Sequence, residues 1–139
     1  MTSHNIAMAL RSAYLSMHRA TNSVLSKHKV TADQFVCLVI LSESFGLTQQ
    51  ELTKKANSDP NTIRAMLLLL QKRGLITRKD HPEDGRAFIV ALTKKGRMLF
   101  DKLVEELKPV RDSMLTLFTE EETESLFHFL NRISQELNK

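Results

Sequence analysis

Polar and basic side chains gather in the middle of the 139-residue chain, at spacings that suit contact with nucleic acid. Asn61, Thr62 and Arg64 fall in the first turns of a predicted helix, and asparagine and arginine can pair with the edges of adenine and guanine. Arg86 follows a polar turn, and an arginine on a narrow protrusion can enter the minor groove of DNA. Asp84, two residues earlier, is placed to brace it. These residue types predict a surface that binds double-stranded DNA.

A second group of residues is suited to phosphate, which fixes affinity and register but carries no base sequence. Thr48 and Gln49 open a predicted helix, and the free N–H groups at a helix N-terminus favour an anion. The basic candidates for phosphate contact are Lys54, Lys55, Arg73, Arg78 and Lys79.

The distribution of charge agrees with this interpretation. Residues 48–97 contain eleven Lys and Arg against five Asp and Glu, whereas residues 98–139 contain five against nine. A basic middle and an acidic C-terminal third are typical of a module that faces a polyanion and is joined to a separate assembly region. Charge alone leaves open a solvated basic face with no partner.

The elements that must position these side chains are mostly helices. Apolar residues recur at helical spacing over residues 4–26, which predicts a first helix. Threonine and a glutamine or glutamate three residues later form capping boxes at Thr31 and Thr48, and Asp59 before Pro60 is a strong helix start. The predicted helices therefore cover residues 31–41, 48–56 and 60–73, the last ending at a glycine suited to the left-handed conformation.

The helix over residues 60–73 forms a helix-turn-helix with its predecessor. Its inward stripe is formed by Ile63, Met66, Leu67 and Leu70, which leaves the polar residues 61, 62 and 64 on the outer side. The helix over residues 31–41 is apolar nearly all round, so we expect it to be central and buried.

A β-hairpin follows, with strands over residues 76–79 and 87–92 and a polar tip over residues 80–86. Thr93 caps the next helix, and Pro109 is expected to kink or divide it. A further capping box at Thr119 and Glu122 begins the last helix. The fold class is mainly α with a small β-hairpin (α+β).

Several stretches resemble the MarR family in order and spacing. They are residues 31–35 (TADQF), 47–52 (LTQQEL), 59–63 (DPNTI), 70–78 (LQKRGLITR), 84–87 (DGRA) and 92–96 (LTKKG). The ordered set extends over nearly the whole chain, and the flanking helices match in kind.

The resemblance implies one winged helix-turn-helix domain over residues 1–139, with a DNA-binding part over about 31–97 and dimerisation helices over about 1–29 and 98–139. It implies a homodimer that binds a pseudo-palindromic operator, as a repressor relieved by a small phenolic or similar ligand. By matching position, Arg86 is the wing-tip arginine with Asp84 as its brace, and Asn61, Thr62 and Arg64 read bases.

This sequence departs from the family pattern at three places. The arginine of the recognition helix is shifted by one position, to give Arg64–Ala65. Leu68 and Leu69 stand where charged residues are frequent, and Gly85 stands where a second arginine is frequent.

The sequence offers little for other functions. It contains no nucleophile elbow, phosphate loop or metalloprotease motif, so we expect no enzyme, no catalytic residue and no cofactor. The five histidines lack ligand spacing, so no metal is expected. Cys37 lies in the most apolar helix and is expected to be inert, although a redox role is an alternative. With no signal peptide and no apolar run of 18 residues, the expected location is the cytoplasm, away from the membrane.

Tyr14, Met17 and His18 are candidates for lining an effector pocket, although packing alone would explain them equally well. An alternative function is a dimeric winged-helix module that binds another protein, or senses a ligand or oxidant, without binding DNA. Steep salt dependence with duplex DNA would separate the two, because each neutralised phosphate contributes a slope near −0.9.

Overall fold

The computed structural model describes residues 2–139, which divide into two compact units, one ending at Glu106 and the other beginning at Leu107. The fold is mainly helical with a small antiparallel sheet, as the sequence predicts. The elements of the first unit are α1 (Ser3–Leu25), a short 3-10 helix η1 (Ser26–His28), α2 (Ala32–Ser42), β1 (Leu47–Thr48), α3 (Gln49–Lys55), α4 (Pro60–Lys72), β2 (Ile76–Asp80), β3 (Phe88–Leu92) and most of α5 (Lys94–Leu115). The second unit holds the end of α5 and α6 (Glu120–Leu137).

The capping residues read from the sequence begin the helices. The Thr31 hydroxyl accepts from the Gln34 amide at 3.1 Å, and the Thr31 amide donates to the Gln34 side chain at 3.1 Å. Asp59 accepts from the Thr62 amide at 2.9 Å, with Pro60 at the first helical position. Gly74 takes the left-handed conformation after α4, with φ of 74°. The predicted helix ends are therefore confirmed to within about two residues, which is the ordinary uncertainty of helix boundaries.

The sheet contains a strand that the sequence analysis missed. β2 and β3 pair antiparallel from Ile76 opposite Leu92 to Asp80 opposite Phe88, and β1 pairs with the other edge of β3, with Leu47 opposite Val90. The strand order is β1-β3-β2. A two-residue strand is too short to produce an alternating pattern, so the prediction of a hairpin alone was incomplete.

The core of the first unit lies around α2, which contacts α1, α3, α4 and β3. The buried apolar side chains come from every layer of the unit; among them are Leu25, Cys37, Leu38, Leu41, Leu52, Ile63, Leu67, Leu70, Leu75, Val90 and Leu103. The central place of α2 is confirmed, although one of its apolar side chains, Val36, is 40% exposed in the single chain.

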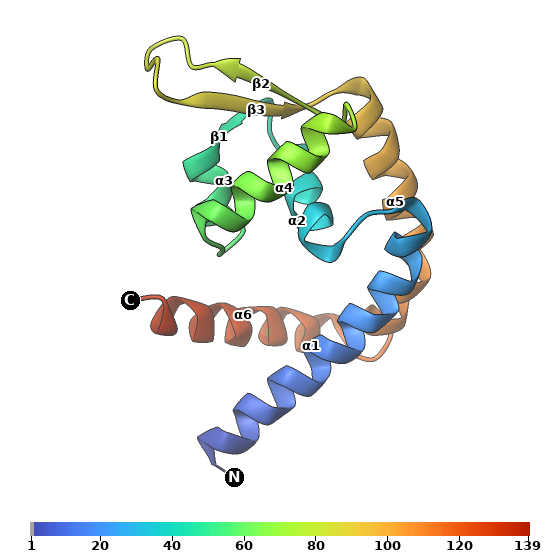
Figure 1. Ribbon diagram of the computed structural model, residues 1–139. Helices are drawn as coiled ribbons and strands as arrows, with labels where there is room; N and C mark the ends of the chain where they lie inside the picture. The colour runs from blue at the N-terminus through green and yellow to red at the C-terminus, as the bar shows by residue number, and fades with distance from the viewer. Residues whose placement is uncertain (1) are drawn as a thin grey trace. The chain divides into compact units, whose positions relative to one another are not determined.

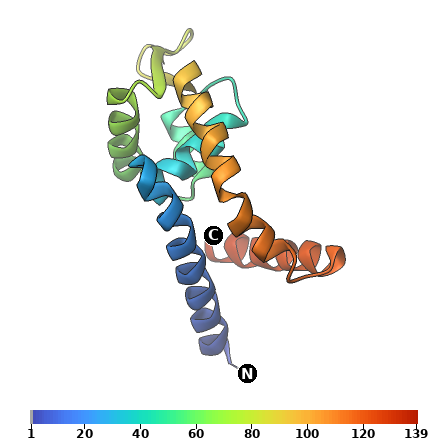
Figure 2. The same ribbon diagram turned by 90° about the vertical axis from the view of Figure 1, so that its right-hand side faces the viewer.

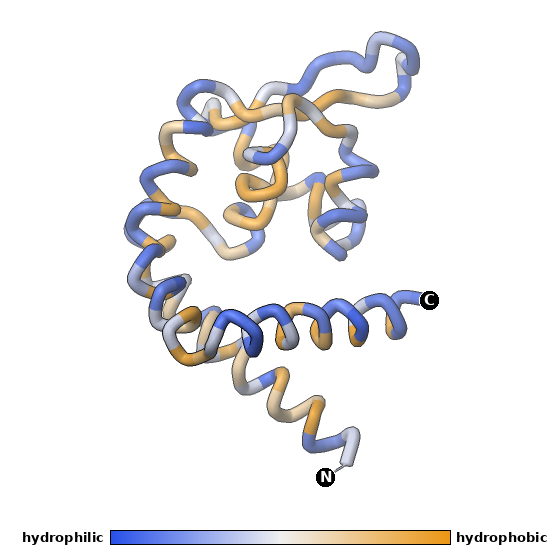
Figure 3. Tube along the Cα trace, turned by 180° about the vertical axis from the view of Figure 1, so that it is seen from behind, coloured by the Kyte–Doolittle hydropathy of each residue, from blue (hydrophilic) through white to orange (hydrophobic). Residues whose placement is uncertain are grey.

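Two parts of the first unit extend beyond its core, the β2–β3 hairpin and the start of α1 (Figure 1, Figure 2). The β2–β3 hairpin reaches out from the body, and the N-terminal half of α1 projects away from the other helices of this unit (Figure 1, Figure 2). The hairpin tip is hydrophilic in Figure 3, whereas α2 is hydrophobic along most of its length. We refer to residues 76–92 as the wing.

Helix α5 is continuous through Pro109, so of the two expected outcomes, a kink or a division, the division is excluded. Proline removes one backbone donor from the helix, and the Ser113 hydroxyl donates to the Pro109 carbonyl at 2.8 Å. In the second unit, the Thr119 hydroxyl accepts from the Glu122 amide at 3.1 Å and begins α6. Hydrophobic and hydrophilic stretches alternate along α6 (Figure 3). Over residues 2–139, no helix has the length and hydrophobicity to span a membrane.

Candidate nucleic-acid interface

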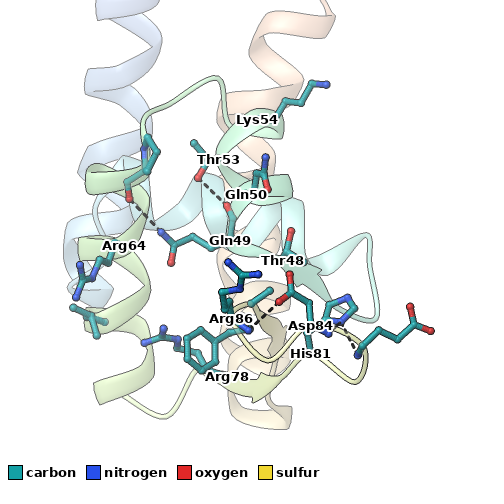
Figure 4. A pocket seen from close by; sticks show the side chains of 15 residues that line it. Thr48, Gln49, Gln50, Thr53, Lys54, Arg64, Arg78, His81, Asp84 and Arg86 are labelled. Carbon is teal, nitrogen blue, oxygen red and sulfur yellow. Dashed lines mark hydrogen bonds between the residues drawn. The ribbon is translucent and has the colours of Figure 1, made fainter.

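An open hollow of about 1120 Å³ lies in the first unit, where α3, the outer side of α4 and the wing come together (Figure 4). Seven of the predicted DNA-contacting residues line it, namely Thr48, Gln49, Lys54, Arg64, Arg78, Asp84 and Arg86. The other lining residues are Gln50, Thr53, Pro60, Leu68, His81, Glu83, Ala87 and Phe88. We call this surface the interface hollow. Its side chains come from three consecutive parts of the chain, α3, α4 and the wing.

The N-terminus of α3 forms one side of the interface hollow. The Thr48 hydroxyl accepts from the Glu51 amide, and the Thr48 amide donates to the Glu51 carboxylate, both at 3.1 Å. Hydrogen bonding of the Glu51 carboxylate by the backbone, and then by the side chain, of Thr48 lowers the pKa of Glu51 below its ordinary value, with small further contributions from Lys55 and His81. The Gln49 side chain donates to the Pro60 carbonyl at 3.4 Å, which ties the start of α3 to the start of α4. The helix-turn-helix is thereby held together at the surface that faces the hollow.

Helix α4 lines the same hollow with Pro60, Arg64 and Leu68, whereas Asn61 and Thr62 are not among the lining residues. Asn61 and Arg64 are exposed, as predicted, whereas Thr62 is half-buried. The Thr62 hydroxyl donates to the Asp59 carboxylate at 2.7 Å. The amide and hydroxyl of Thr62 together lower the pKa of Asp59 below its ordinary value. Thr62 therefore stabilises the helix start, and its hydroxyl proton is already engaged there.

The brace at Asp84 acts on the backbone of the wing. Its carboxylate accepts from the Arg86 amide at 3.0 Å, and its carbonyl accepts from the Ala87 amide at 3.1 Å. The Arg86 side chain is exposed above the interface hollow (Figure 4). Asp84 thus fixes the turn that carries Arg86 and leaves the guanidinium available for a ligand.

Arg78 is held by an aromatic ring that the sequence analysis did not single out. Its guanidinium lies 4.5 Å from the centre of the Phe88 ring, an attractive cation–π arrangement, and its Nε is buried. The two residues lie on neighbouring strands, with Arg78 opposite Val90 and Asp80 opposite Phe88. This diagonal relation depends on strand register, which the sequence pattern alone did not give.

Three predicted phosphate contacts do not line the interface hollow. Arg73 donates to the carbonyls of Lys29 at 2.8 Å and His28 at 3.1 Å, so its guanidinium joins the end of α4 to η1. Lys55 and Lys79 are exposed on α3 and β2, outside the hollow. The structure therefore separates these three cations from the group that converges on the hollow.

The residues predicted to line an effector pocket lie on α1. The rings of Tyr14 and His18 are stacked with centres 5.7 Å apart, and Tyr14 is 55% and Met17 39% exposed in the single chain. They form an aromatic surface one helical turn long.

Comparison with known proteins agrees with this geometry. The MarR family model matches residues 30–88. The chain is similar to an organic hydroperoxide resistance transcriptional regulator of Bacillus subtilis (strain 168), with 27% identity over 82% of this chain and 87% of the relative. It is similar in structure to the transcriptional repressor CouR bound to a 23-mer DNA duplex, with a TM-score of 0.80, 28% identity, and 91% and 89% of the two chains covered. It is also similar to Bordetella bronchiseptica BpsR, whose structure concerns regulation of DNA binding by 6-hydroxynicotinic acid, with a TM-score of 0.85, 25% identity and 96% of each chain covered.

A helix-turn-helix followed by a wing, with polar and basic side chains from both facing one hollow, defines a winged-helix DNA-binding regulator. The family match and the similar structures narrow the assignment from the class of winged-helix regulators to one family. Over residues 30–88 the chain belongs to the MarR family, and the relatives and structures that it resembles over most of its length are transcriptional regulators.

Proposed function

We propose that the protein is a dimeric repressor that binds a pseudo-palindromic operator through the interface hollow. The observation that carries the proposal is the convergence of Gln49, Arg64 and Arg86 from three separate elements on one open surface (Figure 4). In this proposal Asn61, Arg64 and Ala65 face base edges in the major groove, since all three are exposed near the start of α4. Arg86 enters the minor groove, whose negative potential attracts it.

The phosphate contacts follow from the same geometry. The N-terminus of α3, at Thr48 and Gln49, has backbone N–H groups suited to a phosphate. Lys54 and Arg78 line the interface hollow and supply positive charge beside it. Lys55 and Lys79 are exposed nearby on the same elements, so they extend the proposed contact along the backbone. Arg73 is not among the proposed phosphate contacts, because its guanidinium donates hydrogen bonds to two backbone carbonyl groups.

The proposed dimer is formed by a second copy of this chain. On α1, Ile6, Met8 and Tyr14 are 49%, 54% and 55% exposed. On α6, Phe127 and Phe129 are 69% and 52% exposed. A soluble monomer rarely exposes this much apolar surface on single helices, whereas a dimer would bury it. In this arrangement residues 1–29 and 98–139 would hold the two winged-helix parts at a fixed spacing.

The repressor is proposed to respond to a small aromatic acid or phenol at Tyr14, Met17 and His18. The stacked Tyr14 and His18 rings offer an aromatic face with a polar edge, which suits a ligand of that kind. Regulation of DNA binding by such a compound is reported for BpsR.

The salt dependence of duplex binding tests the proposal. We expect the logarithm of affinity to fall linearly with the logarithm of salt concentration, since each phosphate contact contributes about −0.9 to the slope. Arg86→Ala should weaken binding about tenfold at fixed salt, because an inserted charge is lost. Lys139→Ala is the matched control, because it removes the same charge from an exposed position in the second unit. Equal affinity of both variants and the unaltered protein, or a slope near zero, would refute the proposal.

A further inference from the structure

The tip of the wing is organised by the imidazole of His81. Its Nδ1 accepts from the Glu83 amide at 3.0 Å and from the Asp84 amide at 3.1 Å (Figure 4). Acceptance from the second and third residues onward is what an Asn or Asp side chain does at the start of a turn. Here a titratable nitrogen takes the place of that oxygen.

The rest of the turn depends on these two bonds. The His81 amide donates to the Ala87 carbonyl at 3.1 Å and closes the tip. The Asp84 amide donates to His81, and Asp84 in turn accepts from the amides of Arg86 and Ala87. Pro82 has no backbone N–H, so it needs no hydrogen-bond acceptor in the turn. The position of Arg86 therefore follows from His81 through Asp84.

A doubly protonated imidazole has no lone pair and can only donate. Histidine side chains take up a proton between about pH 5 and 8. Protonation would leave the amides of Glu83 and Asp84 facing an N–H donor, and the turn would have to open.

The charged groups around His81 come from two helices, α3 and α4, as well as from the wing itself. Glu51 of α3 interacts electrostatically with His81. Lys54 of α3, Arg64 of α4 and Arg78 of β2 line the same hollow. Within the wing, Asp80, Glu83, Asp84 and Arg86 lie within five residues of it. Both signs are present, so the charge of the imidazolium has no single dominant partner, and the loss of the two hydrogen bonds decides the outcome.

We propose that His81 is a positioning residue for Arg86 and makes the wing sensitive to pH, so that DNA binding weakens when His81 is protonated. This rests on the proposed function for its effect on DNA, but its effect on the wing is independent of DNA. Two substitutions separate the role of Nδ1 as a hydrogen-bond acceptor from its capacity to take up a proton. His81→Asn keeps an acceptor in the place of Nδ1 and cannot titrate, whereas His81→Ala has no acceptor.

The first measurement uses the DNA-free protein. In the unaltered chain, the backbone ¹H–¹⁵N signals of Glu83 and Asp84 should move together as pH is lowered from 8 to 5.5, and those of His81→Asn should stay in place. His4, His18, His28 and His128 are present in both proteins, so a difference between the two belongs to His81. Signals of Glu83 and Asp84 that move equally in both proteins would overturn the proposal.

The second measurement is affinity for one duplex at constant salt across the same pH range. His81→Ala should bind about fivefold more weakly than the unaltered protein at pH 8, as expected for two lost hydrogen bonds in an exposed turn. His81→Asn should bind more tightly than His81→Ala at pH 8 and should lose no affinity between pH 8 and pH 5.5, whereas the unaltered protein should fall toward His81→Ala over that range. If His81→Asn is as weak as His81→Ala, or shares the acid loss, the proposal is wrong. If no variant binds DNA at any pH, the proposed function fails, and the amide signals still decide the role of His81.

Discussion

Gly96 is the position where a single methyl group should do most harm to the fold. A Cβ at this residue would lie 2.0 Å from the Leu75 carbonyl oxygen and 3.0 Å from its carbon. Both are backbone atoms, which cannot rotate away as the end of a side chain can. Since ordinary contact begins at 3.4 Å, the start of α5 and the chain before β2 would have to separate by about 1.4 Å.

That separation would disturb the junction between helix and wing. The Thr93 amide donates to the Leu75 carbonyl at 3.0 Å, and the Thr93 hydroxyl donates to the Gly74 carbonyl at 2.6 Å. Overpacking costs about 1–3 kcal/mol, and each lost hydrogen bond costs about 1 kcal/mol. Alanine regains about 1 kcal/mol over glycine within a helix. We therefore expect Gly96→Ala to lower the free energy of unfolding by about 3 kcal/mol.

Urea unfolding at one fixed protein concentration measures this loss, because the midpoint of a dimer depends on concentration. Gly85→Ala is the matched control, since a Cβ at Gly85 meets no atom within 4 Å. It should lie within about 0.5 kcal/mol of the unaltered protein. The reasoning is refuted if Gly96→Ala is no less stable than Gly85→Ala.

Two further predictions concern ionisable groups. The pKa of Asp59 is lowered in the folded state by the bonds from Thr62, so its stabilising effect is complete above the ordinary carboxyl pKa and is lost as pH falls through the lower folded value. Asp59→Asn, which still caps α4, should therefore lose less stability than the unaltered protein between pH 5 and pH 2.5, as measured by urea midpoints; identical acid profiles would contradict this. Burial, with a smaller contribution from the charge of Asp33, raises the pKa of Cys37 to about 11, and the side chain is 0% exposed. Iodoacetamide at pH 8 should therefore leave the folded protein unmodified by mass and alkylate it fully in urea, whereas rapid alkylation of the folded protein would support a redox role.

The sequence was most informative where a local rule decides the structure. Thr31, Thr48, Asp59 and Thr119 each cap a helix within a few residues, so the helix starts could be predicted from neighbouring side chains alone. Gly74 likewise ends α4 by its own backbone conformation.

The features that escaped prediction depend on distant partners. Arg73 is basic and near the recognition helix, but its partners are the carbonyls of residues 28 and 29, more than forty positions away. β1 exists only because Leu47 meets Val90 across the sheet. Arg78 reaches the Phe88 ring through strand register. Residue type gave the chemistry of each group, whereas tertiary pairing decided which groups remain free for DNA.

The role of His81 lies between these cases. Its contacts are local, with residues 83 and 84, and a histidine before proline in a polar turn was visible in the sequence. Histidine is not among the usual turn-forming residues, so the pattern carried no signal for an acceptor at this position.

The central claim is that the interface hollow binds a specific DNA sequence, and selection from a random duplex library tests it most directly. The account predicts an inverted repeat with half-sites one helical turn apart, about 10 base pairs between centres, because a two-fold dimer presents two copies of α4. Arg86→Ala, selected in parallel, should recover the same repeat with weaker enrichment. A folded, dimeric protein that enriches no sequence, or enriches one without two-fold symmetry, would contradict the account.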